Sequence, residues 1–332
     1  MRKLFPISTL FVATALVFTS CEKDDGYELP DLNATHAYVS SNTSGMVTTM
    51  KVKDLAGVMV EQKKIATMDA DGIYYNGDRD EIILASRSTN RVEVYQKKRD
   101  GSLEIKTTSS PDFTNPREIA VSGNMIVVVQ DGDPAINNNM NRLFVYERTP
   151  SGIRSRNVYD VDFNLWGIHA DGNTLYAVAD NTGDIVSFDN FFANPSGMIQ
   201  PSKRVTIEGL VRTHGITHSK ADNKLILTDI GSAASDNDGA IIVIDNFSAV
   251  YGGTSTGGMI SANQQIRIEG SNTMLGNPVD VGYDEDSNHI YVAERANGGG
   301  MVLIFKMPVA DGSPAPSYSK AVAGASSIYV KN

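Results

Sequence analysis

The sequence predicts an all-β fold built from repeated four-stranded antiparallel sheets. Five segments share one order of features: an apolar strand, a turn rich in Gly, Asn and Asp, a second apolar strand, a polar loop and a third, alternating strand. These segments begin at Gly72, Glu118, Gly167, Gly215 and Asp280. Such a sheet cannot bury both faces alone, so neighbouring sheets must cover one another. Repeats about 40 to 65 residues apart therefore predict a β-propeller, whose blades pack around a central channel.

Most of these repeats also contain a fourth strand. The candidate segments are "SLEIKTT", "IRSRNVYDV", "KRVTIEG" and "QQIRIEG". Two repeats share a longer segment before it, which starts as "DNFFANPSGMIQ" at Asp189 and as "DNFSAVYGGTST" at Asp245. We expect these segments to be related excursions between the third and fourth strands of their blades.

The first blade lacks an opening strand of its own. From His36, "HAYVSSNTSGMVTTMKV" matches strands two and three, and "VMVEQKKIATM" matches strand four. The missing strand is found at the other end of the chain, in "SSIYVKN" from Ser326. Pairing the two terminal strands would close the ring and remove open sheet edges. Residues 36–332 are therefore expected to form a propeller of six blades.

A resemblance at the level of single repeats supports this architecture. The runs "YVSSNTSGMV" and "LYAVADNTGDIVSFD" are similar to the repeats of YVTN-type and NHL-type propellers, and "RDGSLEI" is similar to the lactonase-like members. The resemblance implies a fold more than an activity, because propellers carry many unrelated functions.

Residues 1–20 have the pattern of a secretory signal peptide. Two basic residues precede an apolar run from Leu4 to Phe18, which is short for a membrane span. The only cysteine of the chain, Cys21, follows directly. A single cysteine suits neither a disulfide nor the usual zinc site, and its position resembles the lipobox of bacterial lipoproteins. The resemblance implies a lipid on Cys21; a conventional signal with a chance cysteine is the alternative.

Residues 21–35 are expected to form a flexible, acidic tether. The run "EKDD" after Cys21 is similar to the signal that sends some Gram-negative lipoproteins to the outer face of the outer membrane, and a merely solvated linker is the alternative. We therefore expect a lipid-anchored, surface-exposed protein of the outer membrane, with an outer-membrane transport complex as one candidate partner. The formal net charge of −10 argues against nucleic acid as a partner, because a polyanion requires a basic face.

The channel mouth is the expected place for a ligand. In propellers of this kind, the start of each blade's first strand and the loop after its second strand lie on the same face. These positions form a mixed polar rim of Asp71, Arg117, Glu118, Asp131, Trp166, Asp180, Arg212, His214, Asp229, Asp280, Glu294 and Arg295. Within this rim, the residues predicted to contact a ligand are Trp166, His214, Arg117 and Asp280. Structural roles stay open for several positions, because aspartates are common in turns and Trp and His also occur in cores.

The sequence favours a binding or scaffold module over an enzyme. It contains no H-E-x-x-H motif, no P-loop and no G-x-G-x-x-G motif. A glycan, a peptide or another outer-membrane component is the expected ligand, with Trp166 stacking on an apolar face and Arg117 donating hydrogen bonds. A purely structural partner in a transport assembly would instead present a broad exposed apolar patch.

The main alternative is a calcium-dependent lactonase. Resemblance to six-bladed enzymes of this type implies carboxylates that hold a metal ion at the channel mouth, where the ion polarises an ester carbonyl. The candidate ligands are Glu118, Asp229 and Asp280, with His214 as the base. Two long loops, which start at Asp131 and Asp229, also carry oxygen ligands that suit calcium. No other cofactor is implied.

Overall fold

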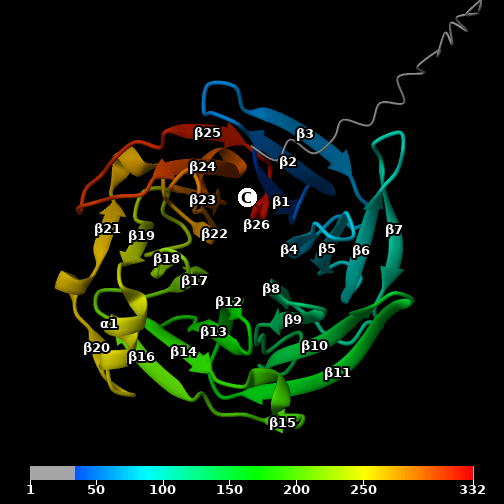
Figure 1. Ribbon diagram of the computed structural model, residues 1–332, viewed down its shortest axis with the longest axis horizontal. Helices are drawn as coiled ribbons and strands as arrows, with labels where there is room; N and C mark the ends of the chain where they lie inside the picture. Colours follow the sequence, from blue (N-terminus) through cyan, green and yellow to red (C-terminus); the bar gives the residue numbers. More distant parts are fainter. Residues whose placement is uncertain (1–33, 332) are drawn as a thin grey trace, which may run out of the picture. The chain divides into compact units, whose positions relative to one another are not determined.

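The computed structural model describes residues 34–331, which form a ring of six β-sheets (Figure 1). Each sheet has four strands in consecutive antiparallel pairings, as the first blade illustrates, and two of the sheets have a fifth strand that pairs in parallel. The structure thus confirms the predicted six-bladed β-propeller. The predicted signal peptide and lipidated Cys21 lie outside the described residues, as does most of the tether. The first strand begins at Thr35, a residue that the sequence analysis assigned to the tether.

The blades are numbered in chain order, and the C-terminal strand β26 belongs to blade one. Blade one contains β26 (Ala325–Lys331), β1 (Thr35–Ser41), β2 (Met46–Val52) and β3 (Met59–Lys64). Blade two contains β4 (Ala70–Asn76), β5 (Glu81–Ser86), β6 (Arg91–Lys97) and β7 (Leu103–Thr108). Blade three contains β8 (Pro116–Ser122), β9 (Met125–Gln130), β10 (Asn141–Thr149) and β11 (Gly152–Val161).

The remaining three blades repeat this order. Blade four contains β12 (Leu165–Asp171), β13 (Thr174–Ala179), β14 (Asp184–Phe188) and β16 (Lys203–Ile207). Blade five contains β17 (Thr213–Ser219), β18 (Lys224–Asp229), β19 (Ala240–Ile244) and β21 (Ile266–Glu269). Blade six contains β22 (Pro278–Asp284), β23 (His289–Glu294), β24 (Met301–Lys306) and β25 (Tyr318–Ala321).

The ring closes by pairing its terminal strands, as predicted. Strand β26 pairs antiparallel with β1, with Ala37 opposite Val330 and Val39 opposite Ile328. Ile328 is buried in the core cluster that blade one shares with blade six. The last strand of the chain therefore acts as the innermost strand of the first blade and covers the inner edge of β1.

The two excursions lie where the sequence placed them, but each reaches further than expected. The first contains η1 (Phe191–Ala193) and β15 (Gly197–Met198), and β15 pairs with β11 of the preceding blade. The second contains α1 (Phe247–Gly253), β20 (Met259–Ile260) and η2 (Ala262–Gln264), and β20 pairs with β16. Both added pairings are parallel. Each excursion therefore extends the outer edge of the previous blade, a contact between blades that no single repeat reveals.

The helices are few and short in the described part of the chain. Besides those of the excursions they are η3 (Ser271–Thr273) and η4 (Asn297–Gly299). Within residues 34–331, no helix is long and apolar enough to cross a bilayer.

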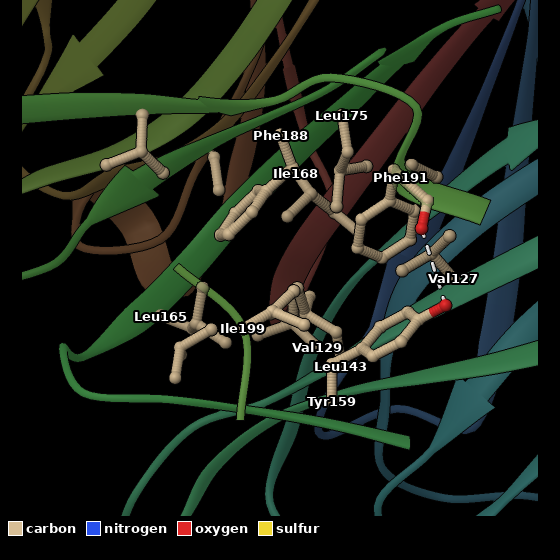
Figure 2. Packing of buried hydrophobic residues seen from close by; sticks show 14 of the residues in the cluster. Val127, Val129, Leu143, Tyr159, Leu165, Ile168, Leu175, Phe188, Phe191 and Ile199 are labelled. Carbon is tan, nitrogen blue, oxygen red and sulfur yellow. Dashed lines mark hydrogen bonds between the residues drawn. The ribbon is translucent and has the colours of Figure 1, made fainter. Parts of the chain in front are cut away.

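The hydrophobic core lies between adjacent blades. Figure 2 shows Val127, Val129, Leu143 and Tyr159 of blade three facing Leu165, Ile168, Leu175 and Phe188 of blade four, with Phe191 and Ile199 of the first excursion. The Tyr159 hydroxyl donates a hydrogen bond to the Phe191 carbonyl at 3.3 Å, so this buried aromatic ring is also satisfied at its polar end. Because apolar packing between blades holds the ring together, the channel ends of the inner strands can carry polar residues.

Candidate functional site

A β-bulge near the start of the innermost strands positions the site. The pairing with the second strand shifts register between Pro116 and Ile119, between Leu165 and Ile168, and at the equivalent positions of the other blades. A bulge places two consecutive residues outside the regular alternation and re-aims their side chains. Two layers of residues result, which we call the mouth layer and the inner layer.

The mouth layer is the second residue of each innermost strand, and the inner layer is the third. The mouth layer consists of Asp71, Arg117, Trp166, His214, Val279 and Ser326. The inner layer consists of Gly72, Glu118, Gly167, Gly215, Asp280 and Ser327.

A cavity of about 530 Å³ opens at the mouth layer. It is lined by Arg117, Asp131, Gly132, Asn164, Trp166, Asp180, Asn181, Arg212, His214, Ile230, Ala233, Asn277, Val279 and Arg295. These residues come from the starts of the innermost strands and from the loops after the second strands, the two sets that the sequence analysis placed on one face. The volume falls within the range of about 300–1,000 Å³ that is typical of small-molecule sites.

Backbone hydrogen bonds hold the cavity rim in the same way in all six blades. The residue before each innermost strand accepts a hydrogen bond from the residue after the second strand. Examples are Asp180 N to Asn164 O (2.9 Å) and Ile230 N to Arg212 O (3.0 Å). The remaining four link Arg87 to Asp69, Asp131 to Asn115, Arg295 to Asn277 and Asn42 to Gly324. The rim is therefore built on a repeated backbone clamp, and only its side chains differ between blades.

Trp166 lies in the middle of a three-layer stack. The imidazole of His214 is parallel to the indole, with ring centroids 3.7 Å apart and an interplanar angle of 3°. The guanidinium carbon of Arg117 lies 4.1 Å from the indole centroid. Two groups so close to one ring must occupy its opposite faces, because they would collide on the same face. The expected stacking of Trp166 on a sugar or apolar ligand is therefore wrong for this arrangement, since neither face of the ring is available.

Arg117 is held in place by a carboxylate. Its Nε and one terminal nitrogen donate to Asp131 Oδ2 at 3.0 and 2.9 Å, and Asn115 Nδ2 donates to the same oxygen at 3.3 Å. Burial raises the pKa of Asp131, although the Arg117 charge opposes this shift. Arg117 therefore contributes to the cavity wall as a fixed cation, already paired and stacked.

His214 is a buried, neutral imidazole in the cavity wall. Its side chain is 2% exposed, and Nε2 lies 3.4 Å from Asp180 Oδ1. Burial lowers the pKa of His214, and the contact with Asp180 does not reverse this shift. Burial alone would raise the pKa of Asp180, but His214, the Asn181 backbone N–H and Arg212 together hold it below its usual value. Within residues 34–331, neither His214 ring nitrogen makes a hydrogen bond of good geometry.

The charges of the cavity wall favour an anion. Three arginines line it, Arg117, Arg212 and Arg295, against the two aspartates Asp131 and Asp180. With His214 neutral, the lining carries one net positive charge, whereas the whole chain has a formal charge of −10. Burial lowers the pKa of Arg295, and the charge of Arg117 adds to this shift, so positive charges are crowded at the mouth. An anionic group bound here would relieve that repulsion.

Asp280 does not line the cavity, contrary to the sequence prediction, and it lies in the inner layer with Glu118 and Ser327. The Ser327 hydroxyl donates to Asp280 Oδ2 at 2.8 Å and lies 3.2 Å from Glu118 Oε1. Asp280 also accepts from the backbone N–H groups of Ile328 and Val281, both at 2.7 Å. These contacts tie together blades three and six and the closing strand.

The two inner carboxyl groups, Glu118 and Asp280, both have raised pKa values. Burial, together with the charge of Asp280, raises the pKa of Glu118 well above its ordinary value. Burial also raises the pKa of Asp280, to about 6, despite the hydrogen bonds that favour its charged form. Two carboxyl groups buried side by side disfavour ionisation of both, so the pair binds protons more tightly than free carboxyl groups do.

Glycines let the innermost strands approach at this level. A Cβ atom on Gly167 would lie 2.1 Å from the His214 carbonyl oxygen. Gly72 has a φ of +72°, and a Cβ there would lie 2.7 Å from the Ile119 nitrogen. No side chain fits at these two positions, and the inner layer is consequently narrow.

The predicted metal ligands are not assembled into a site. Asp229 accepts hydrogen bonds from Arg212 N (2.8 Å) and Val211 N (3.2 Å), a structural role at the start of β17. Glu118 and Asp280 are occupied with each other and with Ser327. In the described part of the chain, no group of three or more His, Cys, Asp or Glu side chains could hold a metal ion. These residues therefore do not fit the calcium ion of the lactonase alternative.

The other predicted rim residues also divide between structure and cavity. Asp71 pairs with Arg87, and Glu294 accepts hydrogen bonds from the backbone N–H groups of Gly276 and Asn277. Arg212 and Arg295 line the cavity. Sequence reasoning missed Asn164 and Asn277, although both directly precede an innermost strand, as Arg212 does. Aligning the repeats one residue earlier would have found them.

A serine motif away from the cavity carries no chemistry of its own. The run "GTSTG" at residues 253–257 has the letters of a nucleophile elbow. An elbow requires a serine between a strand and a following helix, whereas Ser255 comes after α1 in the second excursion. We therefore do not assign a nucleophile to it.

Comparison with known proteins supports the fold. No protein-family model and no curated protein sequence matches the chain. A chain of the nidogen/laminin complex is similar in structure, with a TM-score of 0.61 and 14% identity over 89% of this chain and 98% of the other. A candidate 6-phosphogluconolactonase from Bacteroides uniformis matches with a TM-score of 0.61 and 10% identity over 90% and 100% of the two chains. A second, from Bacteroides fragilis, matches with a TM-score of 0.58 and 11% identity over 92% and 100%.

At these identities the comparisons establish a shared fold and leave function to the site. The fold and cavity together define a six-bladed β-propeller with a polar, arginine-rich cavity at one mouth of its channel.

Proposed function

We propose that this protein is a binding propeller whose mouth cavity holds the anionic part of a glycan or peptide ligand. The observation that carries the proposal is the concentration of Arg117, Arg212 and Arg295 in one cavity of an acidic chain. Guanidinium groups recognise carboxylate and phosphate groups through paired, charge-assisted hydrogen bonds. The negative charge of the rest of the chain would disfavour binding of an anion elsewhere on the surface.

The wall chemistry also supports binding by polar contacts more than by apolar ones. Trp166 is covered on both faces, and the remaining apolar lining consists of Ile230, Ala233 and Val279. Affinity would therefore come from hydrogen bonds and charge in a partly enclosed site, where they are stronger than in open water.

A thermal-shift panel tests the proposal. Acidic oligosaccharides, neutral oligosaccharides, and peptides with and without phosphoserine are each added to the domain of residues 34–332. A native-state ligand raises the melting temperature, and only the anionic members are expected to do so. Arg212→Glu should abolish the shift, whereas Arg99→Glu, the same charge change at an exposed turn between β6 and β7, should preserve it. Equal shifts from neutral and anionic ligands, or shifts that survive Arg212→Glu, would contradict the proposal.

The proposed location is the outer face of the outer membrane, through a lipid on Cys21. The support is the sequence pattern around Cys21, which lies outside the described residues. Replacing Cys21 by Ser should release the protein from the membrane fraction, and replacing Glu22, Asp24 and Asp25 by Ala should leave it lipidated but less accessible to added protease. Full retention of Cys21→Ser in membranes would reject the lipid anchor. An outer-membrane transport complex stays a candidate partner of this anchored form.

A second candidate function is hydrolysis of a sugar lactone. Two of the similar structures are candidate 6-phosphogluconolactonases, and this cavity contains a neutral imidazole beside a carboxylate, His214 and Asp180. A neutral His214 could accept a proton from water, while an arginine stabilised the developing oxyanion. Proton release from glucono-δ-lactone, corrected for spontaneous hydrolysis, tests this candidate. A rate above the blank that disappears in His214→Gln would favour it over simple binding.

A further inference from the structure

Arg117 and Arg212, two of the three arginines that line the cavity, differ in the contacts that hold their side chains. Arg117 donates two hydrogen bonds to Asp131 and is stacked on Trp166. Arg212 has only a loose contact, with its Nε 3.6 Å from Asp180 Oδ1. That Nε finds no hydrogen-bond partner among residues 34–331, and the side chain is 31% exposed. Arg212 is therefore better able than Arg117 to turn toward a bound group.

His214 lies two residues further along the chain, in β17, and apart from the 3.4 Å contact of its Nε2 with Asp180 it shares this lack of partners. Its side chain is buried in the cavity wall, and neither ring nitrogen is hydrogen-bonded to any described residue. Buried nitrogens without partners are unusual in native proteins and point to a ligand group that completes them. Arg212 Nε and the single N–H of the neutral His214 ring therefore form one side of the cavity that requires an acceptor.

The opposite requirement is found on blade six. Asn277 lines the same cavity, and its Oδ1 has no donor within the described residues. An amide oxygen accepts hydrogen bonds only, so its partner must bring an O–H or N–H group. A ligand that matches the cavity therefore has a hydrogen-bond acceptor near Arg212 and His214 and a hydrogen-bond donor near Asn277.

The remaining wall argues against an amino group or an aromatic ring on the ligand. An ammonium would need a carboxylate, but Asp131 is bound by Arg117 and Asn115, and Asp180 by the backbone and side-chain nitrogens of Asn181. An aromatic ring would need a stacking surface, and both faces of Trp166 are covered. Zwitterionic amino acids and aromatic acids are thus poor matches.

From these complementary groups we infer that the cavity binds an acidic sugar, with a carboxylate toward Arg212 and His214 and a hydroxyl toward Asn277. This inference rests on the proposed binding function and selects a hydroxylated carboxylic acid, either free or as a terminal uronate of a glycan, over a peptide. Because the unpartnered atoms of Arg212, His214 and Asn277 are all buried, binding requires small side-chain rotations that turn these three residues toward the ligand.

Calorimetric titration with glucuronate, glucose and acetate tests the inference. Glucuronate is expected to bind at least tenfold more tightly than either comparator, because each comparator supplies only one of the two groups. Arg212→Gln should weaken glucuronate binding at least tenfold. Asn277→Ala should weaken it several-fold without changing the response to acetate. The matched control Arg99→Gln, which removes an exposed arginine outside the cavity, should bind as the wild type does.

A glucuronate-terminated oligosaccharide in the same titration distinguishes a free acid from a glycan end. Tighter binding of the oligosaccharide identifies the glycan end as the ligand, and equal binding identifies the free acid. If glucuronate binds no better than acetate while a phosphopeptide binds in an Arg212-dependent manner, the inference fails and the proposed function survives. If no anion of the panel binds, both fail.

Discussion

The mouth layer and the inner layer consist of neighbouring residues on the same strands, but the two layers have different roles. Arg117 faces the cavity and its sequence neighbour Glu118 lies in the buried carboxyl pair. Val279 and Asp280 divide in the same way on blade six. Figure 1 shows the innermost strands β4, β8, β12, β17, β22 and β26 arranged around the centre of the ring. A step of one residue at the bulge thus separates a surface that can meet ligands from contacts that hold the ring closed.

This difference teaches that polarity on an inner strand does not by itself mark a ligand site. Both layers contain charged residues, but those of the inner layer are satisfied by one another and by the closing strand. The mouth layer contains His214, and Arg212 directly precedes the same strand; both His214 ring nitrogens and Arg212 Nε lack hydrogen-bond partners among the described residues. The state of the hydrogen bonds, more than the residue type, distinguishes the two layers.

Removing the closing strand should break the inner layer and have the largest effect. Deleting residues 326–332 removes the Ser327 contacts to Asp280 and Glu118, the burial of Ile328 and the pairing with β1. We expect a loss comparable with the whole stability of a domain, about 5–15 kcal/mol, and hence an unfolded or aggregated protein. Circular dichroism and urea denaturation measure the loss. A truncated protein that unfolds as the wild type does would show that the ring closes in another way; Val309→Ser, at a 93% exposed position, is the control.

Trp166→Ala should show that one member of the mouth layer behaves as core. The indole is 9% exposed, packs in the apolar cluster between blades four and five, and is sandwiched by Arg117 and His214. Truncation is expected to destabilise the fold by about 3–5 kcal/mol, as for other buried aromatic residues. Trp166→Phe keeps an aromatic ring in the stack and should lose less. Thermal unfolding of both variants decides the point, and an unchanged melting temperature for Trp166→Ala would return Trp166 to the ligand surface.

Glu118→Gln tests the raised pKa values of the inner carboxyl pair. Folding raises the pKa of Glu118 and raises the pKa of Asp280 to about 6, so the folded state binds more protons than the unfolded chain above about pH 4. The pair's contribution to stability is therefore present at low pH and is lost as pH rises through these raised values. A glutamine amide still donates a hydrogen bond but cannot ionise, so the variant should lose less stability between pH 5 and pH 9, by about 1–3 kcal/mol.

Urea denaturation at pH 5, 7 and 9 measures this difference. Glu147→Gln provides the control, because Glu147 is a surface carboxylate that pairs with Arg154 and Arg156 on blade three. If the unfolding free energies of wild type and Glu118→Gln change with pH in the same way, the inner pair takes up no proton on folding.

Of these changes, Arg212→Gln should have the smallest effect on stability, as expected for a residue that contacts a ligand and does not hold the fold together. Its side chain is 31% exposed and its contact with Asp180 is 3.6 Å long. Loss of such an ion pair usually changes unfolding free energy by no more than about 0.5–1 kcal/mol. Chemical denaturation checks this expectation, alongside the loss of anion binding described above. A large destabilisation without a binding defect would place Arg212 in the structural set with Arg117.

The sequence by itself determined the repeat, the six blades and their closure. Alternating apolar residues, turn residues such as Asn and Gly, and the missing first strand of blade one are local features, and local features fix strands and turns. The face of the site was also predictable, because equivalent positions of a repeat must lie at equivalent heights around the channel. This reasoning brought Arg117, Trp166 and His214 to one cavity.

Tertiary structure alone decided the roles of those residues. The covered faces of Trp166, the withdrawal of Asp280 from the cavity and the separate role of Asp229 all depend on side chains from other blades. The return of β15 and β20 to the preceding blade is likewise a contact between repeats. The repeat pattern predicts where along the channel each residue lies and to which face of its blade it points. The contacts between residues of different blades cannot be predicted in this way, because the blades differ in sequence. At the β-bulge the side chains no longer alternate between the two faces of the sheet, so the direction of each side chain there depends on the residues of the neighbouring blades that it contacts.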